Sequence, residues 1–356
     1  MDICYAIIMD ILQKVDGSRK CSGIYYILTG KKTSQSLSDS QWFEIEQYYA
    51  SLKGLTLDDF NSIIDELYMD ELINLKEDNV FFVTKKGVEF LGEIKGRYLF
   101  IEKLNGLKYA SIEHKCWQVI TLFVQSLSNS LYNNFDFSPV IRDREAAEKV
   151  KILFPRSEQQ RKHIASYLYN ELNTVLQKCD SEGAEIFVKK LSGYNRVGNT
   201  FEQSAREWGL TKIETVLRFR SVLHQIFKSI REQPGMYPVL SSLIGDFIVV
   251  PALTKSALQT YQLLQKEKDI QEIMKIRNLK LSTMEDHLVE IAREIPEFSI
   301  HPYISEEDKE KVILFYNKTK ENKLRPIKEA FPHLTYLQIR LVLAKEGGKH
   351  AVGSGT

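Results

Sequence analysis

The sequence lacks the paired cysteines that a zinc site or a disulfide framework needs. Its 356 residues contain four cysteines, Cys4, Cys21, Cys116 and Cys179, which are far apart and form no Cys-x-x-Cys pair. Structural zinc sites take closely spaced ligands, and disulfide frameworks are typical of small secreted domains. We therefore expect reduced, buried thiols and no bound metal.

Long apolar runs are also missing. The most apolar stretches are short or are interrupted by a charge, as Asp10 interrupts residues 5–12. A membrane-spanning helix needs about 20 predominantly apolar residues. The start of the chain, Met1-Asp2, lacks the basic region of a signal peptide. These features predict a cytoplasmic, nucleoid-associated protein without membrane contact.

Motifs of the common catalytic sites are absent as well. Gly23 and Gly30 precede Lys31-Lys32-Thr33, but six residues separate the glycines where a phosphate-binding loop has four. We find no His-Glu-x-x-His, Gly-x-Ser-x-Gly, deaminase or kinase signature, and the seven histidines form no triad. We predict a non-enzymatic protein with no cofactor, catalytic residue or small-molecule substrate. An undetected nuclease or other enzyme is the third-ranked alternative.

The charge is distributed unevenly, although the net charge is only +1. Residues 39–78 hold eleven acidic side chains against two lysines, whereas residues 189–231 and 311–349 each hold nine basic against three acidic ones. One acidic and two basic regions indicate segments that contact different partners.

Hydrophobic periodicity predicts a mainly α protein with several domains. Residues 1–110 read as a winged-helix-like domain, because a helix over 57–73 is followed by a hairpin over 74–83 and another helix; a different small α+β domain is the alternative. Residues 111–253 form a helical middle domain, and 254–281 form a charged helical spacer. Residues 282–347 form a helix-turn-helix domain that opens with a capping box at Ser282 and Glu285, and 348–356 form a flexible tail.

The C-terminal domain provides the main DNA-binding candidates. A short helix from Pro326, a tight turn and a final helix from Thr335 have the order in which the second helix enters the major groove. Thr335, Gln338 and Lys345 share one arc of that helix, and Arg340 adds charge. The apolar residues around the arc favour the alternative of a buried packing helix. In that case phosphates would be bound by the basic side chains before it, Lys318, Lys320, Lys323, Arg325 and Lys328.

The helix over 211–231 offers a second, weaker candidate. Ala205 and Gly209 resemble the core of a helix-turn-helix motif, and the helix that follows carries one apolar face. Its basic candidates for phosphate binding are Arg218, Arg220, His224 and Arg231. The alternative is an ordinary solvated face.

The N-terminal domain points to a protein partner. Its presumed recognition helix would present Asp58, Asp59, Asp65, Glu66, Asp70 and Glu71 and no basic residue. DNA phosphates would repel this surface, so we predict that it binds protein.

Two segments carry a family resemblance: residues 22–39, which begin Ser22-Gly-Ile-Tyr-Tyr-Ile-Leu-Thr-Gly-Lys-Lys-Thr, and the terminal unit over 304–343. Together they resemble the YpbB-like proteins of Gram-positive bacteria. The terminal unit is similar to the helicase-associated helix-turn-helix domain of some RecQ-type DNA helicases. The resemblance implies an accessory role beside such a helicase, and it carries over no catalytic residue.

These observations give two leading hypotheses. The first is a DNA-associated adaptor in replication or repair, whose partners are DNA, bound weakly through phosphates, and a RecQ-type helicase or another replication-fork protein. The second is a sequence-specific transcriptional regulator, which would normally bind one palindromic site as a dimer.

Overall fold

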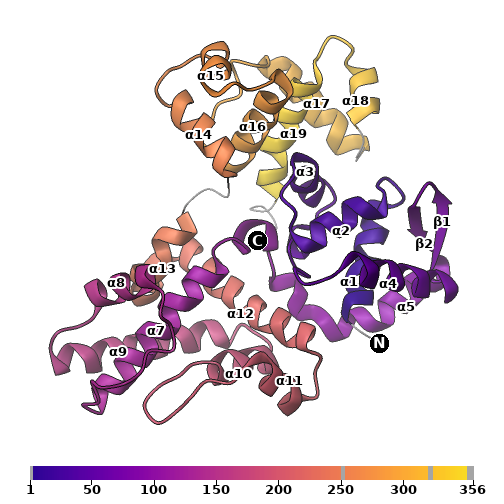
Figure 1. Ribbon diagram of the computed structural model, residues 1–356. Coiled ribbons are helices and arrows are strands. Elements are labelled where there is room, and N and C mark those ends of the chain that lie inside the picture. The colour runs from indigo at the N-terminus through magenta and orange to yellow at the C-terminus, as the bar shows by residue number, and fades with distance from the viewer. Residues whose placement is uncertain (1–2, 250–252, 320–323, 351–356) are drawn as a thin grey trace. The chain divides into compact units, whose positions relative to one another are not determined.

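The computed structural model describes residues 3–249, 253–319 and 324–350, most of which are helical (Figure 1). The chain divides into two compact units. The first comprises Met1–Lys31 and Glu46–Val250, and the second comprises Lys32–Ile45 and Pro251–Thr356. The mainly helical class expected from the sequence is confirmed.

The first part of unit one has the element order of a winged helix. Its elements are α1 (Ile3–Val15), α2 (Cys21–Thr29), η1 (Glu46–Tyr48), α4 (Leu57–Met69), β1 (Ile73–Glu77), β2 (Val80–Val83), α5 (Lys85–Lys95) and η2 (Gly96–Lys103). The strands pair antiparallel, with Ile73 opposite Val83. The turn between them uses Asp78 and Asn79 at φ 38° and 63°, a conformation that these two residue types tolerate. This hairpin is the wing beside α4 in Figure 1.

The second part of unit one is a helical bundle. It contains α6 (Gly106–Tyr109), α7 (Glu113–Leu131), α8 (Arg144–Leu153), α9 (Glu158–Leu176), α10 (Ser181–Lys189), α11 (Phe201–Trp208), α12 (Lys212–Glu232), η3 (Pro234–Met236) and α13 (Pro238–Val249). Helix α12 lies at its centre and packs against α7, α9, α10, α11, α13 and η2. Because helices surround α12, its polar flank is buried together with its apolar face.

The second unit is also helical. It consists of α3 (Ser34–Trp42), α14 (Lys255–Leu264), α15 (Ile270–Arg277), α16 (Leu281–Glu294), α17 (Glu306–Thr319), α18 (Leu324–Ala330) and α19 (Tyr336–His350). Helix α3 comes from the N-terminal half of the sequence, and Trp42 at its end contacts the ring of Tyr316 on α17. This inserted helix was not expected from the sequence.

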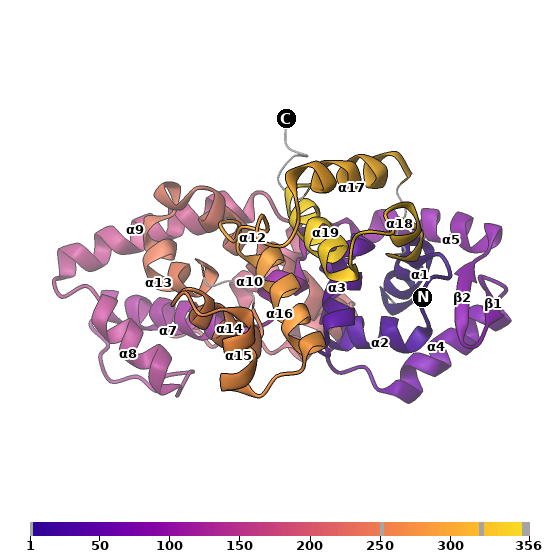
Figure 2. The ribbon, with the colours of Figure 1, turned by 90° about the horizontal axis from the view of Figure 1, so that it is seen from above.

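The structure differs from the expected spacer over 254–281. A left-handed residue, Glu267, follows α14, and α14 and α15 both pack against α16 (Figure 2). Ile273 is fully buried in the same hydrophobic core as α16 and α19. The charged segment 265–269, which suggested a solvated spacer, forms only the turn between two packed helices. Residues 254–281 are therefore part of the C-terminal unit.

Two further boundaries differ from expectation. Helix α16 begins at Leu281 after Lys280, which makes no side-chain cap, so Ser282 does not open the expected capping box. Helix α19 extends to His350, into the segment expected to be a tail. Residues 351–356 of that segment lie outside the described residues.

Candidate nucleic-acid interface

The turn before α19 is held by the capping box that the sequence predicts. The Thr335 amide donates to Gln338 Oε1 at 2.7 Å, and the Gln338 amide donates to Thr335 Oγ1 at 3.2 Å. These bonds satisfy backbone donors that a helix N-terminus leaves free. They also occupy the Gln338 carbonyl oxygen.

Three polar side chains of α19 are bonded to other parts of the same unit. Gln338 Nε2 donates to the carbonyl oxygen of Tyr303 at 2.8 Å, and Arg340 Nη2 pairs with Asp286 at 2.6 Å. Lys345 Nζ donates to the carbonyl oxygens of Ile295 and Pro296 at 2.8 and 3.0 Å. Because these side chains are bonded within the unit, the contacts of α19 are those of a packing helix, which the sequence left open as the alternative to a base-reading helix.

The apolar side of α19 explains this role. Ile339, Leu341 and Val342 are fully buried, and Leu343 is nearly so, in a core shared with α16, α17 and α18. Consecutive buried residues 341–343 turn more than one face of the helix inward. A helix buried on several sides cannot lie in a DNA groove without unpacking the domain.

The basic side chains before α19 are more accessible. Lys318 at the end of α17 is exposed, and Arg325 on α18 is exposed and paired on the surface with Glu329 at 2.8 Å. Such a surface pair is weak and can be exchanged for a phosphate contact. Lys328 is half-buried and donates to the carbonyl oxygens of Pro332 and Leu334, which makes it part of the turn. Lys320 and Lys323 lie outside the described residues.

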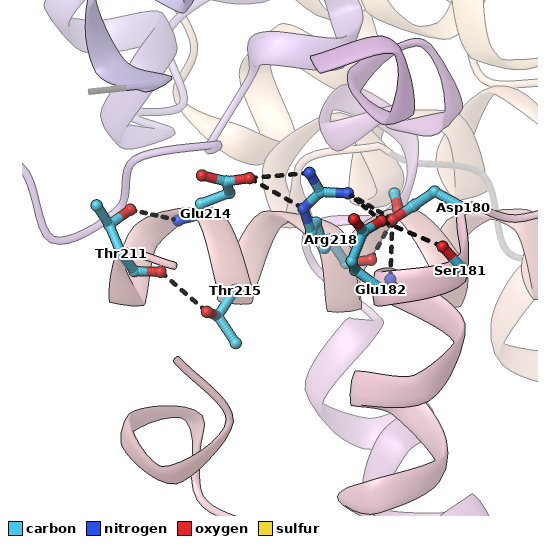
Figure 3. Close-up of polar contacts among 9 residues, drawn as sticks. Asp180, Ser181, Glu182, Thr211, Glu214, Thr215 and Arg218 are labelled. Carbon is cyan, nitrogen blue, oxygen red and sulfur yellow. Dashed lines mark hydrogen bonds and ion pairs between the residues drawn. The ribbon is translucent and has the colours of Figure 1, made fainter. Parts of the chain in front are cut away.

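In the middle bundle, Arg218 is not available to phosphate. Its side chain is only 10% exposed, and its guanidinium pairs with Asp180, Glu182 and Glu214 at 2.6, 3.3 and 2.9 Å (Figure 3). Burial alone would lower the pKa of this guanidinium, but hydrogen bonds to Glu214 and Asp180 outweigh that effect and raise it. The charge of Arg218 is therefore neutralised by Glu214 on α12 itself and by Asp180 and Glu182 at the start of α10.

Arg220 and His224 are likewise internal. Arg220 Nε and Nη2 bind Glu113 Oε1 at 2.9 and 2.8 Å, and Nη1 donates to the carbonyl oxygens of Ala50 and Ser51. His224 is completely buried. Its Nδ1 accepts from the Asn105 amide at 2.9 Å, so Nε2 carries the proton and donates to Glu113 Oε1 at 2.7 Å.

This Glu113 cluster joins the two halves of unit one. Burial would raise the pKa of Glu113, but the His224 hydrogen bond and the Arg220 charge lower it to about 2. Burial lowers the pKa of His224 despite its bond to Glu113. The cluster thus fixes α12 and α7 to the loop that contains Ala50.

The tight backbone around that loop accounts for two glycines. A Cβ on Gly106 would lie 1.7 Å from the Tyr49 carbonyl oxygen, and a Cβ on Gly30, at φ 77°, would lie 2.6 Å from the Cβ of Ala50. Glu113 could not be identified from local sequence patterns, because its partners on α12 are more than 100 residues away. Of the four basic candidates on α12, only Arg231 is exposed.

The six acidic residues predicted to bind a protein are all exposed, as expected. Asp58, Asp59 and Asp65 lie on α4, and Asp70 and Glu71 follow it. Glu66 accepts a hydrogen bond from the Tyr5 hydroxyl, and Glu71 pairs with Lys86 at 3.5 Å. Two apolar side chains, Tyr68 and Met69, are exposed beside them. The surface therefore combines negative charge with apolar area.

Across the described ranges 3–249, 253–319 and 324–350, no cluster of three or more histidine, cysteine or carboxylate side chains could hold a metal ion. No helix in those ranges is long and apolar enough to cross a membrane.

Comparison with known proteins agrees with this architecture. A family model described as a helix-turn-helix domain matches residues 256–343, which include α14 and α15. The chain is 29% identical over 343 residues to protein YpbB of Bacillus subtilis (strain 168), covering 95% of this chain and 96% of that protein. No solved structure matches the chain significantly. The resemblance noted in the sequence is thus confirmed.

Proposed function

We propose that this YpbB-like protein is a non-enzymatic, DNA-associated adaptor, accessory to a RecQ-type helicase in DNA replication or repair. One observation carries the proposal: the polar side chains of α19 are bonded within their own unit, as Gln338, Arg340 and Lys345 show. DNA then meets the exposed cations of α17 and α18. Contacts of this kind bind phosphates and position a protein, but they do not read a sequence.

The helicase partner is supported by the family resemblance of the C-terminal domain. The helix-turn-helix match over 256–343 supports DNA binding by the same domain. The exposed acids of α4 support a separate role for the N-terminal part, because a negatively charged helix is repelled by DNA and attracts a basic protein surface. One end of the chain would bind DNA and the other end a protein.

The DNA interface is tested by the salt dependence of binding. For about three to five phosphate contacts, log Kd plotted against log salt should have a slope of about 3 to 4.5 in magnitude for duplex DNA. Changing Lys318, Lys323 and Arg325 together to alanine should flatten this slope by about 2 to 3 and weaken scrambled and selected duplexes alike. Lys328 is left intact because it bonds to the turn before α19.

Gln338→Ala provides the matched contrast, because Gln338 is the best base-reading candidate on α19. We expect it to leave the sequence preference and the salt slope unchanged, with a loss of stability from the broken capping box of about 1 kcal/mol. Fluorescence anisotropy at one salt concentration gives the comparison. If Gln338→Ala abolishes a strong preference for one duplex while the triple variant binds normally, the regulator hypothesis replaces the adaptor.

The acidic surface is tested in the full chain, because residues 1–31 and 46–110 share a compact unit with the middle bundle. Changing Asp58, Asp65 and Asp70 to alanine should abolish capture of the protein partner and leave DNA affinity within about two-fold, since phosphates are repelled from this surface. The readout is affinity purification from cells with quantitative mass spectrometry after nuclease treatment. Asp59 is kept because it bonds to the cap residue Thr56. A large loss of DNA affinity would contradict the assignment.

A further inference from the structure

The middle bundle carries exposed aromatic rings beside arginines that form no ion pair with a carboxylate of the described residues. The set is formed by the end of α7 with the loop after it, the start of α9 and the loop over 193–199, and we call it the aromatic–arginine surface. Its members are Tyr132, Phe135, Tyr194, Arg156, Arg161 and Arg196. None of them was singled out by the sequence, because they come from three separate segments.

The aromatic rings are exposed and held in place. Tyr132 and Phe135 are 65% and 64% exposed, which is unusual for rings of this size on a folded domain. The ring of Tyr132 stacks on that of Tyr194, with centroids 4.4 Å apart and planes 13° from parallel. Stacking in this way leaves the outer face of Tyr132 available to another flat group.

Backbone contacts fix the two loops that carry these rings. The Tyr194 amide donates to Ser128 Oγ of α7 at 3.0 Å. A Cβ at Gly193 would lie 2.7 Å from that same oxygen, so a larger residue would displace the Ser128 hydroxyl from this bond. On the other side, Asn134 bonds through its amide and its side chain to Asn129. The stacked pair is therefore preorganised, which reduces the entropy lost on binding.

Arginines lie beside the rings, together with one exposed acid, Asp136, which follows Phe135. The guanidinium of Arg161 lies 5.7 Å from the centroid of Phe135, and Arg161 Nη1 donates to the carbonyl oxygen of Arg156 at 3.0 Å. Arg196 faces Gly193 across the bridge that closes the second loop. Within the described parts of the chain, the side chains of Arg156 and Arg196 form no ion pair or hydrogen bond. The nearby acid Glu158 is already paired with Lys162 at 2.6 Å.

We propose that the aromatic–arginine surface binds single-stranded DNA. Flat aromatic rings that stack on bases, next to arginines that contact phosphates, are what an unpaired strand requires. A duplex does not fit this chemistry, because its bases are already stacked on one another. The competing proposal is a protein partner. Apolar rings without unpaired charged side chains beside them would favour it, whereas here Arg156 and Arg196 lie in the same surface. This site is distinct from the C-terminal interface and does not depend on the proposed function.

The test measures binding of a fluorescein-labelled deoxythymidine oligomer of about 15 nucleotides to the full chain. The background is the triple variant at Lys318, Lys323 and Arg325, so that the C-terminal interface does not contribute. Changing Tyr132 and Phe135 together to alanine should weaken binding by between about 5-fold and 150-fold for each ring removed. Tyr132→Phe should retain binding, because a phenyl ring stacks as well as a phenol.

The control is Tyr68→Ala, which removes a tyrosine that is 49% exposed on the acidic helix α4 and should leave binding unchanged. Changing Arg156 and Arg196 to glutamine should flatten the salt slope by about 1.4, since each phosphate contact on a single strand contributes about 0.7. Thermal unfolding of every variant verifies that it is folded. The additional fluorescence of Tyr132→Trp, over that of the three tryptophans of its parent, reports from the site itself, because the oligomer should quench it.

The proposal is overturned if the folded double variant at Tyr132 and Phe135 binds the oligomer as tightly as its parent. It is equally overturned if a blunt duplex competes as well as the single strand, or if the Tyr132→Trp fluorescence does not respond at saturation. Quenching by the oligomer together with weaker binding of the double variant supports it.

Discussion

A Glu113→Ala variant is expected to lose about 3–5 kcal/mol of unfolding free energy, because removing one member of a buried ion pair leaves the other uncompensated. Arg220 would keep its charge with only the carbonyl oxygens of Ala50 and Ser51 as partners. His224 would lose the acceptor of its Nε2 proton while completely buried. Urea unfolding followed by circular dichroism measures the loss. The matched control, Glu158→Ala, removes an exposed pair with Lys162 and should leave the unfolding free energy nearly unchanged.

The same cluster gives the protein an acid-sensitive stability. Both Glu113 and His224 have lowered pKa values in the folded chain, so the unfolded chain binds more protons than the folded one. Their contributions are complete above the unfolded pKa values and are lost as pH falls. The loss begins below about pH 6.5 for His224 and extends from about 4.5 to 2 for Glu113. The Glu113→Ala variant should lack the loss of stability between about pH 4.5 and 2. If its unfolding free energy depended on pH as that of its parent does, the assigned ion pair would be contradicted.

An Arg218→Ala variant is expected to lose about 3 kcal/mol of unfolding free energy and to keep the DNA affinity of its parent. Asp180, Glu182 and Glu214 would face one another without the cation that now holds them together (Figure 3). The packing of the guanidinium on the Phe100 ring, 4.4 Å from its centroid, would also be lost.

Arg231→Ala is the control for Arg218, because it removes an exposed arginine from the same helix. Its effect on stability should stay within about 0.5 kcal/mol, as for most surface substitutions. Stability is measured by urea unfolding, and DNA affinity by fluorescence anisotropy. If Arg218→Ala proved as stable as its parent but bound DNA more weakly, Arg218 would be a phosphate ligand after all.

Several features were predictable because they depend on neighbouring residues. The wing between β1 and β2 follows from strand-forming residues around Asp78 and Asn79, and the start of α19 follows from Thr335 and Gln338 three residues apart. The acidic character of α4 also needs only the local sequence, because its charged residues are too numerous to be buried. Local periodicity and capping were therefore sufficient to predict the helical class, the wing and the start of α19.

The fate of the charged side chains on long helices was decided by tertiary packing. Periodicity places Arg218, Arg220 and His224 on a polar flank, but it cannot show that α10, η2 and the loop at Ala50 cover that flank. Their partners, Asp180, Glu113 and Asn105, are 38 to 119 residues away in sequence. The basic excess over 189–231 was therefore a poor guide to DNA binding, since much of it is neutralised internally.

The sequence by itself determined a helical chain with an acidic winged helix at one end and a basic helix-turn-helix at the other. Those properties follow from residue spacing and composition, which act over a few turns. Only the tertiary structure decided that Gln338, Arg340 and Lys345 of α19 are bonded within their own unit, that 254–281 joins the C-terminal core, and that Tyr132 meets Tyr194. Each of these depends on which distant segments cover a given face, and side-chain chemistry along one helix does not specify that.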